Sequence, residues 1–308
     1  MSSEPFKWKQ FFKLFYDRIW EAQVLDRAAQ VAFYFSFSLF PLIFFLISLA
    51  GIVLGTTDTL KSELFMYLSR IMPWSAFDLV QSTVEEIIAG STTGKLTLGL
   101  LATLWSASLG VDSLRSSLNA VYKLDEKRPW WKTKLQSISL TVMAIALIAL
   151  ALGVAFYGLQ LIQWALVSLT LPTGPPVIAT IIQWVAILFV MLFACEVLFN
   201  LVPAFRRFRW IWITPGSIVA IALWILLTGG FRTYLGFFDS YNRTYGSLGA
   251  VIILMLWLYL TALAVLFGGA INAVYEELKR YPRSASLSPE QLAEFEQAQK
   301  KNYVANAE

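Results

Sequence analysis

Long stretches without charge dominate the hydrophobic pattern of the chain. No side chain between Lys134 and Glu196 is charged, and a turn cluster, Leu171–Pro176, lies in the middle of that stretch. A helix rises about 1.5 Å per residue, so one helix of this length would be about three times as long as the hydrocarbon core of a bilayer. The pattern therefore predicts two membrane-crossing helices joined by the turn cluster.

Windows with little or no charge recur along the chain and predict an all-α fold, a polytopic membrane helix bundle of about six transmembrane helices with amphipathic surface helices. Their approximate bounds are 28–54, 94–111, 135–160, 177–202, 211–231 and 247–274. The window 94–111 is the weakest, because Lys95 and Asp112 leave only a short uncharged stretch between them. Together the windows define a transmembrane domain at about 28–275.

Three segments outside the windows have patterns of their own. The arm 1–27 contains an amphipathic stretch at 6–22, which predicts a helix on the membrane surface, with partner docking as the alternative role. Its apolar residues at helical spacing are Trp8, Phe11, Phe12, Phe15 and Ile19. The loop 55–93 carries two amphipathic patterns, which predict either helices resting on the outer leaflet or a cap over a cavity. The tail 276–308 is polar.

The distribution of positive charge predicts the orientation. Most of the 24 Lys and Arg residues fall in the arm, in the loops after the second and fourth windows, and in the tail. Cytoplasmic loops carry the excess of Lys and Arg, so both termini are expected to be cytoplasmic and the loop 55–93 periplasmic. The beginning of the chain lacks the apolar core of a signal peptide, so we expect the first window to insert the chain and to remain in the mature protein.

The same basic segments predict a partner. They are short and separate, which argues against nucleic acid and favours the anionic head groups of membrane lipids at the cytoplasmic face. An envelope protein or a second copy of the chain is the other partner that the sequence leaves open.

Composition narrows the chemistry further. Hydrophobic residues make up 57% of the chain and charged residues 14%, and the mean hydropathy is +0.63. The chain has no histidine and one cysteine, Cys195, so we expect no histidine-based catalysis, no His- or Cys-rich metal site, no cofactor and no internal disulfide. Cys195 lies in an apolar stretch and is interpreted as a small buried hydrophobe.

Polar residues near the ends of the windows are the candidate site. Glu196 is the only acid within the six windows, and Asn200 follows it by one helical turn. A polar pocket open to the cytoplasm is predicted from Glu196, Asn200, Asn119, Arg115 and Asn272. Two interpretations of Glu196 stay open. It is either half of a structural ion pair at the helix end, with Arg206, Arg207 or Arg115, or a proton- or ion-coupled site.

Small residues and one proline carry the expected packing features. Steps of three or four residues through Gly246, Ala250, Ala264 and Gly268 form a small-residue face along the last window, which predicts close helix packing, with a path for a substrate as the alternative. Gly249 and Gly269 are expected to serve the same packing. Pro41 in the first window is expected to bend that helix.

Two stretches carry a resemblance to a known family. They are 28–41, with Ala-Ala-Gln-Val-Ala-Phe-Tyr and Ser-Leu-Phe-Pro, and 245–272, which begins Tyr-Gly-Ser-Leu-Gly-Ala. With these motifs the chain resembles the YihY/BrkB family of bacterial inner-membrane proteins from about Asp26 to Glu277. The resemblance implies six spans in the cytoplasmic membrane. Members have been named virulence or serum-resistance factors, transporters and, in an early assignment, a ribonuclease.

The polar residues of the chain argue against ribonuclease activity. RNA cleavage needs acid–base groups, usually including histidine, or carboxylates that hold metal ions. The acids Asp112, Asp125 and Glu126 alternate with basic residues and lack the spacing of metal ligands. We expect that the chain is not an enzyme. We expect instead that it moves a solute or lipid across or within the membrane. The alternative is a non-enzymatic envelope scaffold or partner anchor, and an enzyme acting on lipids comes third.

Overall fold

The structure is a computed structural model of the 308-residue chain. It describes residues 8–54, 62, 65–70, 72, 74, 77–78, 80–82, 85, 96–168, 176–205, 210–237 and 241–280. Within these, the backbone alone is described at 40–54, 96–103, 163, 165–167, 176–178, 237, 241–248 and 280.

The long elements of the described part are all α-helices, which confirms the predicted all-α class. They are α1 (Trp8–Glu21), α2 (Val24–Leu54), α5 (Leu96–Val121), α6 (Trp130–Ser168), α7 (Pro176–Leu201), α8 (Pro215–Phe237) and α9 (Tyr241–Arg280).

Four of these helices are long and apolar enough to cross a membrane. The candidate spans within the described residues are Trp130–Ile162, Ala179–Leu201, Pro215–Gly236 and Gly249–Lys279. The chain is therefore a multi-pass membrane protein. The helices α2 and α5, of 31 and 26 residues, are also longer than the roughly 20 residues that a crossing needs. Their crossing, and with it the count of about six, stays a prediction.

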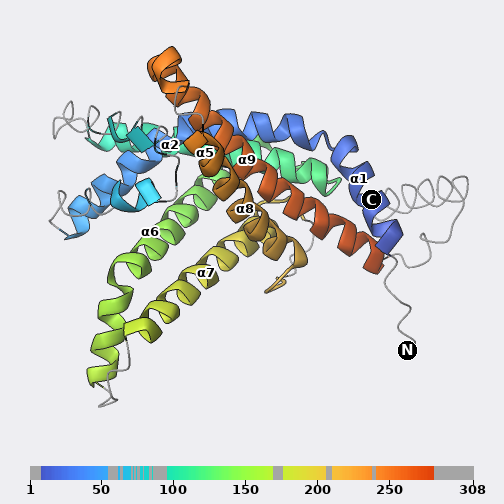
Figure 1. Ribbon diagram of the computed structural model, residues 1–308. Helices are drawn as coiled ribbons and strands as arrows, with labels where there is room; N and C mark the ends of the chain where they lie inside the picture. The colour runs from blue at the N-terminus through green and yellow to red at the C-terminus, as the bar shows by residue number, and fades with distance from the viewer. Residues whose placement is uncertain are drawn as a thin grey trace, which may run out of the picture.

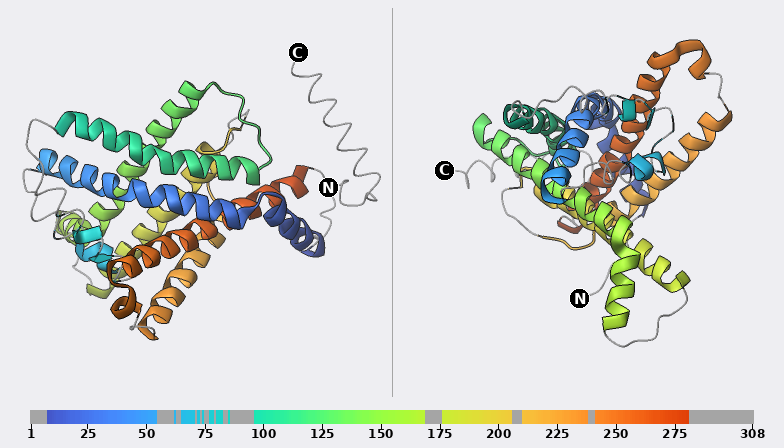
Figure 2. Two further views of the ribbon diagram at one scale, coloured as in Figure 1. Left: turned by 90° about the horizontal axis from the view of Figure 1, so that it is seen from above. Right: turned by 90° about the vertical axis from the view of Figure 1, so that its left-hand side faces the viewer.

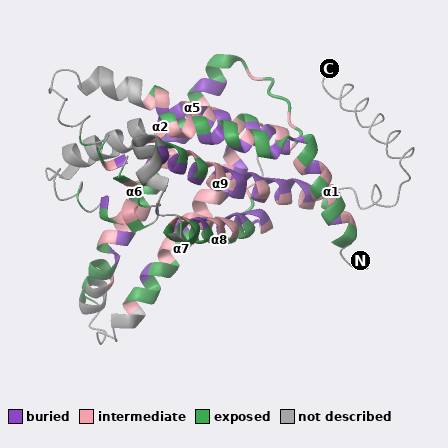
Figure 3. Ribbon diagram, turned by 45° about the horizontal axis from the view of Figure 1, so that its top comes forward, coloured by how far each residue is buried: buried purple, intermediate pink, exposed green. Residues whose placement is uncertain are grey.

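The helices form two groups that meet at one end. Figure 2 shows α2, α5 and α9 running alongside one another, and α8 packs on α9. The helices α6 and α7 pack on each other and diverge from α2 and α5 toward their far tip (Figure 1). Buried residues concentrate in the first group, whereas α6 and α7 expose much of their length (Figure 3). Most exposed side chains of α7 are large and apolar, as expected of a helix that faces lipid.

Both helix groups, α1 and the connection between α7 and α8 meet at the end that we call the basic end. It is formed by residues 8–24, 118–134, 199–205, 210–217 and 266–280. Three contacts tie it together across the sequence: Arg18 donates to the Val121 carbonyl at 2.7 Å, the Ala204 N–H donates to Asn119 Oδ1 at 2.8 Å, and the Gly216 N–H donates to Asn272 Oδ1 at 2.7 Å.

The helix α5 continues past the predicted window 94–111 because the charges that closed the window are paired. Lys134 of α6 donates to Asp112 at 2.8 Å, and Arg115 lies 3.1 Å from the same carboxylate. Arg115 also donates to the Thr133 carbonyl and to Ser137 Oγ of α6, each at 2.7 Å. The charges therefore fasten α5 to α6 instead of ending the helix.

Some of the described residues of the loop 55–93 pack on the core of the bundle. Phe65, Met72 and Val80 are buried in one cluster with Leu254 and Trp257 of α9. Met66 and Trp74 are exposed, so the interpretation of helices resting on the outer leaflet stays a prediction. A role of this loop as a lid stays a prediction.

The predicted bend at Pro41 lies in α2, which continues through this residue as helix. Nothing beyond the backbone is described at Pro41 and Gly246, so both expectations stay predictions. Gly249 is buried in α9.

Candidate functional site

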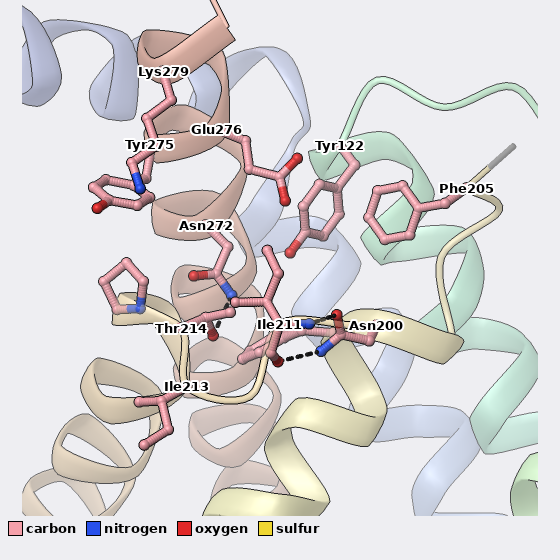
Figure 4. Close-up of a pocket in the computed structure, with 12 residues that line it drawn as sticks. Tyr122, Asn200, Phe205, Ile211, Ile213, Thr214, Asn272, Tyr275, Glu276 and Lys279 are labelled. Carbon is pink, nitrogen blue, oxygen red and sulfur yellow. Dashed lines mark hydrogen bonds between the residues drawn. The ribbon is translucent and has the colours of Figure 1, made fainter. Parts of the chain in front are cut away.

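A cavity of about 290 Å³ lies at the basic end, where α5, α7, α8 and α9 meet, and we call it the junction pocket. Figure 4 shows its lining. The lining residues are Tyr122, Phe199, Asn200, Phe205, Ile211, Ile213, Thr214, Pro215, Asn272, Tyr275, Glu276 and Lys279. Polar groups form its floor, and aromatic and charged side chains form its rim.

Glu196 lies directly beneath the floor and is 1% exposed. One carboxylate oxygen accepts from the Thr214 N–H at 2.7 Å and from the Thr214 hydroxyl at 3.0 Å. The other accepts from Asn200 Nδ2 at 3.2 Å. A buried carboxylate is costly unless it is paired or hydrogen-bonded, and these three bonds meet that requirement within the described residues.

Asn200 joins α7 to the connection that follows it. Its Oδ1 accepts from the Ile211 N–H at 3.1 Å, while its Nδ2 donates toward the Ile211 carbonyl at 3.2 Å (Figure 4). The same Nδ2 donates to the Glu196 carbonyl, four residues back in α7, at 2.8 Å. The Asn200 side-chain amide therefore hydrogen-bonds to the backbone of α7 and to that of the connection after it, and holds the floor of the pocket in place.

The N-terminus of α8 forms the other half of the floor. Thr214 precedes Pro215, and its hydroxyl accepts from the Ser217 N–H at 3.3 Å, the arrangement of an N-cap followed by proline at the first helical position. Asn272 of α9 donates to the Thr214 hydroxyl at 2.9 Å and accepts from the Gly216 N–H at 2.7 Å. The N–H groups of Gly216 and Ser217, in the first turn of α8, therefore donate to the side chains of Asn272 and Thr214, respectively.

The position of Glu196 at this helix end also has an electrostatic reason. The N-terminus of a helix carries a partial positive charge, which stabilises a nearby carboxylate. Because the Thr214 N–H points at Glu196, the charge of the carboxylate lies at the positive end of α8. The network of Glu196, Asn200, Thr214 and Asn272, which we call the junction network, thus links α7, α8 and α9.

Two glycines bring α8 and α9 into close contact at this level. A methyl group at Gly268 would lie 2.5 Å from the Gly216 carbonyl oxygen and 2.7 Å from Ala220 Cβ. One at Gly269 would lie 2.8 Å from the Leu118 side chain of α5. At Gly268 the close neighbours belong to or are fixed directly to the backbone of α8, so a small residue keeps α8 and α9 close there, whereas at Gly269 the neighbour is the end of a leucine side chain.

Aromatic side chains and two opposite charges form the rim. Tyr122 packs edge-on against Phe205 at 5.1 Å, and the Lys279 ammonium lies 4.5 Å from the Tyr275 ring. Figure 4 shows the Tyr122 hydroxyl pointing into the pocket beside the Glu276 carboxylate. Burial raises the pKa of Tyr122, and the negative charge of Glu276 adds to the rise, so this hydroxyl keeps its proton at neutral pH.

The structure brings three of the five predicted site residues together: Asn200 and Asn272 line the pocket, and Glu196 supports them from below. Asn119 lies behind the pocket wall, where it accepts from the Ala204 N–H and lies 3.5 Å from Glu126. It positions the connection between α7 and α8 and is not among the lining residues.

Arg115 lies elsewhere, on the seam between α5 and α6. Its partners are Asp112 at 3.1 Å and Glu126 at 3.7 Å, so the expected ion pair of Glu196 with Arg115 is not formed. Arg206 and Arg207, the other expected partners of Glu196, lie outside the described residues. The described partners of the carboxylate are the neutral side chains and the backbone N–H of the junction network.

Several pocket residues were not predicted from the sequence: Tyr122, Phe205, Thr214, Tyr275, Glu276 and Lys279. A signal was present for Thr214, because threonine followed by proline is typical of a helix start. Tyr275, Glu276 and Lys279 are neighbours on α9, and only the folded bundle brings them together with Tyr122, which follows α5, and Phe205, which follows α7.

The described residues contain no group of three or more His, Cys, Asp or Glu side chains arranged to hold a metal ion. Within them, the pocket offers amides, hydroxyls and one charge of each sign. Groups of these kinds can hydrogen-bond and ion-pair with a polar molecule.

Comparisons with known proteins agree with the membrane fold. A ribonuclease-like protein, YfkH of Bacillus subtilis (strain 168), is 29% identical over 272 residues, which cover 88% of this chain and 97% of that protein. A UPF0761 membrane protein of Stenotrophomonas maltophilia (strain K279a) is 26% identical over 283 residues. Another, of Xanthomonas campestris pv. campestris (strain B100), is 24% identical over 295 residues.

The two UPF0761 relatives are longer than this chain. The match covers 88% and 92% of this chain but 62% and 63% of those proteins. No solved structure matches significantly.

A family model described as Virulence factor BrkB matches residues 15–292 of the 308. This match confirms the resemblance seen in the motifs at 28–41 and 245–272. Because the model spans most of the sequence, the chain belongs to the BrkB family of membrane proteins.

Proposed function

We propose that the chain moves a small polar solute or a lipid across or within the cytoplasmic membrane of a bacterium, and that the junction pocket is its binding site at the cytoplasmic side. The observation that supports this most is an open pocket at the basic end whose floor is a buried polar network. An ionisable side chain buried among membrane helices, such as Glu196, is costly unless it is paired or hydrogen-bonded, and such residues are candidates for a functional site.

The pocket lies at a junction that relative motion of the helices would reshape. The residues of its floor come from α7, α8 and α9, and α7 belongs to the pair of helices that diverges from the others (Figure 1). A displacement of α7 against α8 and α9 would separate Glu196 and Asn200 from Thr214 and Asn272. The junction network is then the contact that closes the bundle at this end.

The orientation in this proposal follows from charge and aromatic residues. The basic end carries the excess of Lys and Arg, and the tryptophans Trp130, Trp131 and Trp212 are exposed there. Tryptophan is enriched at membrane interfaces and positive loops face the cytoplasm. We therefore propose that both termini are cytoplasmic and that this end lies at the head groups of the inner leaflet. Catalysis forms no part of the proposal.

A non-enzymatic scaffold or partner anchor is the second candidate. It is supported by the filled interior, since two apolar clusters occupy the described space between α2, α5, α8 and α9. A scaffold needs such packing and no path for a solute, so flux separates the two candidates.

The test is flux through the purified full-length chain in proteoliposomes. Scrambling of a fluorescent phospholipid and uptake of a panel of radiolabelled polar solutes are compared between the natural chain and a Glu196→Gln, Asn272→Ala variant. We expect at least one compound to move faster than in empty vesicles, and the variant to lose that flux. The control is Gly153→Ala in α6, where an added methyl group meets nothing within 4 Å. Rates equal to those of empty vesicles for every compound would rule out transport.

A further inference from the structure

The helix α1 presents a regular stripe of aromatic side chains to the outside of the molecule. Trp8, Phe12, Tyr16 and Trp20 follow one another at intervals of four residues and are 62%, 61%, 60% and 58% exposed. Residues four apart lie on one side of a helix, so these four form a continuous band, which we call the α1 stripe. Tyr16 and Trp20 contact each other edge-on at 6.0 Å along this band.

The opposite side of α1 is fixed to the bundle. Phe11 and Arg18 are buried, and Phe15 packs against Phe267 of α9 at 6.1 Å. The Arg18 guanidinium donates to the Val121 carbonyl at the end of α5 and forms an ion pair with Glu277 of α9. The exposure of the stripe is therefore not the result of a loosely attached helix.

Charged side chains flank the stripe in a consistent order. Lys9, Lys13, Asp17 and Glu21 each follow one residue of the stripe and form a parallel row about 100° round the helix from it. The two lysines lie beside the N-terminal half of the stripe and are exposed, and the two acids lie beside its C-terminal half, where Glu21 pairs with Lys123 at 2.7 Å. Exposed aromatic residues with lysines beside them are typical of a helix lying in a membrane interface, where the lysines reach lipid phosphates.

The α1 stripe also continues an aromatic level that other elements form at the same end. Trp130 and Trp131 at the start of α6 and Trp212 in the connection before α8 are exposed, and α6 to α9 are the candidate spans. Tryptophans of this kind mark the level of the head groups. The stripe thus has a membrane surface available at its own level.

We propose that α1 is a membrane-surface helix whose partner is the leaflet at the basic end, with the α1 stripe at the boundary of head groups and acyl chains and Lys9 and Lys13 on acidic head groups. Since Arg18 joins α1 to Glu277, next to Glu276 of the pocket rim, the leaflet holds this end of α9 in place. The membrane contact does not depend on the proposed transport function.

The test uses two neighbouring positions in the full-length chain. Cys195 is replaced by serine, and a spin label is attached at Tyr16→Cys, within the stripe, or at Asp17→Cys, on the side expected to face water. Both chains are placed in nanodiscs of phosphatidylcholine and phosphatidylglycerol. The accessibility of each label to oxygen, which concentrates in the acyl region, is compared with its accessibility to a water-soluble nickel chelate.

We expect the label at Tyr16→Cys to be reached better by oxygen and the label at Asp17→Cys better by the nickel chelate. Equal preference for the nickel chelate at both positions would overturn the proposal, because the stripe would then face water. Protection of Tyr16→Cys from both reagents would overturn it in favour of a protein partner or a second copy. In nanodiscs of phosphatidylcholine alone, the oxygen preference at Tyr16→Cys is expected to fall, and an unchanged preference would contradict the role of acidic head groups.

Discussion

Replacing Gly268 with alanine is expected to force α8 and α9 apart at the floor of the junction pocket. The new methyl group would lie 2.5 Å from the Gly216 carbonyl oxygen and 2.7 Å from Ala220 Cβ, whereas ordinary contact begins at 3.4 Å. Neither atom can rotate away, because one belongs to the backbone and the other is fixed directly to it. The two helices therefore have to separate locally by roughly 1 Å, since repulsion rises steeply below contact distance.

The magnitude follows from three contributions. Overpacking of this kind costs about 1–3 kcal/mol. Stretching the bond from the Gly216 N–H to Asn272 weakens an interaction worth about 1 kcal/mol, and it is 2.7 Å long in the structure. The higher helix propensity of alanine returns about 1 kcal/mol. The net loss is about 1–3 kcal/mol in the free energy of unfolding.

Gly229 of α8 provides a matched control, because a methyl group there meets nothing within 4 Å. Gly229→Ala is expected to leave stability unchanged or to raise it by up to about 1 kcal/mol. The assay is reversible denaturation of both variants and the natural chain in mixed micelles. Equal stability of Gly268→Ala and Gly229→Ala would refute the close approach of α8 and α9.

Further variants are measured in the same mixed micelles. Glu196→Ala removes an acceptor of three hydrogen bonds and is expected to cost about 3–5 kcal/mol, whereas Glu196→Gln keeps the shape and costs about 1–3 kcal/mol. A Glu196→Gln chain as stable as the natural chain would contradict the importance of the charge. Arg18→Ala removes the contacts of α1 with α5 and with Glu277, so hydrogen exchange in α1 should accelerate while exchange in α6 stays unchanged. The hydrogen bonds of Arg128 hold the pKa of Glu126 below 4.5, so the pair stabilises the fold above that pH and loses this effect as the pH falls through the lowered pKa. Melting temperatures of the natural chain and Arg128→Ala should therefore converge on acidification, and a constant difference would contradict this.

The membrane architecture was predictable because it depends on local composition. The charge-free stretch between Lys134 and Glu196 predicts two crossings, and the structure has α6 and α7 there, joined around the turn cluster. Hydrophobicity over about 20 residues decides such elements without reference to distant parts of the chain. The family resemblance was likewise carried by motifs within single helices.

The pairing of charges was not predictable, because it joins segments far apart in the sequence. Asp112 weakens the window 94–111 on its own, but Lys134 of α6 satisfies it and the helix continues. Glu196 was expected near arginines, and its described partners are neutral groups at the start of α8. The N-terminus of a helix attracts a carboxylate without any basic residue. Which helix end lies next to Glu196 depends on tertiary packing.

The pocket was predictable only in part for the same reason. Glu196 and Asn200 share one face of α7 by their spacing, and Asn272 was singled out as a polar residue near a helix end. The rim residue Tyr122 follows α5 and the rim residue Lys279 lies on α9, and only the folded bundle brings them together. The loop 55–93 shows the complementary case at three described residues, since Phe65, Met72 and Val80 pack against protein where the pattern alone also allows lipid.

The most direct test of the account is to close the junction pocket during transport. Tyr275, which lines the pocket, is replaced by cysteine in a Cys195→Ser chain, and a membrane-impermeant methanethiosulfonate is added to proteoliposomes from the side of the basic end. We expect the flux of the transported compound to stop on modification, to return when a reductant removes the group, and to be unaffected in the Cys195→Ser parent. Flux that continues unchanged through the modified chain, or no flux above empty vesicles in any chain, would contradict it.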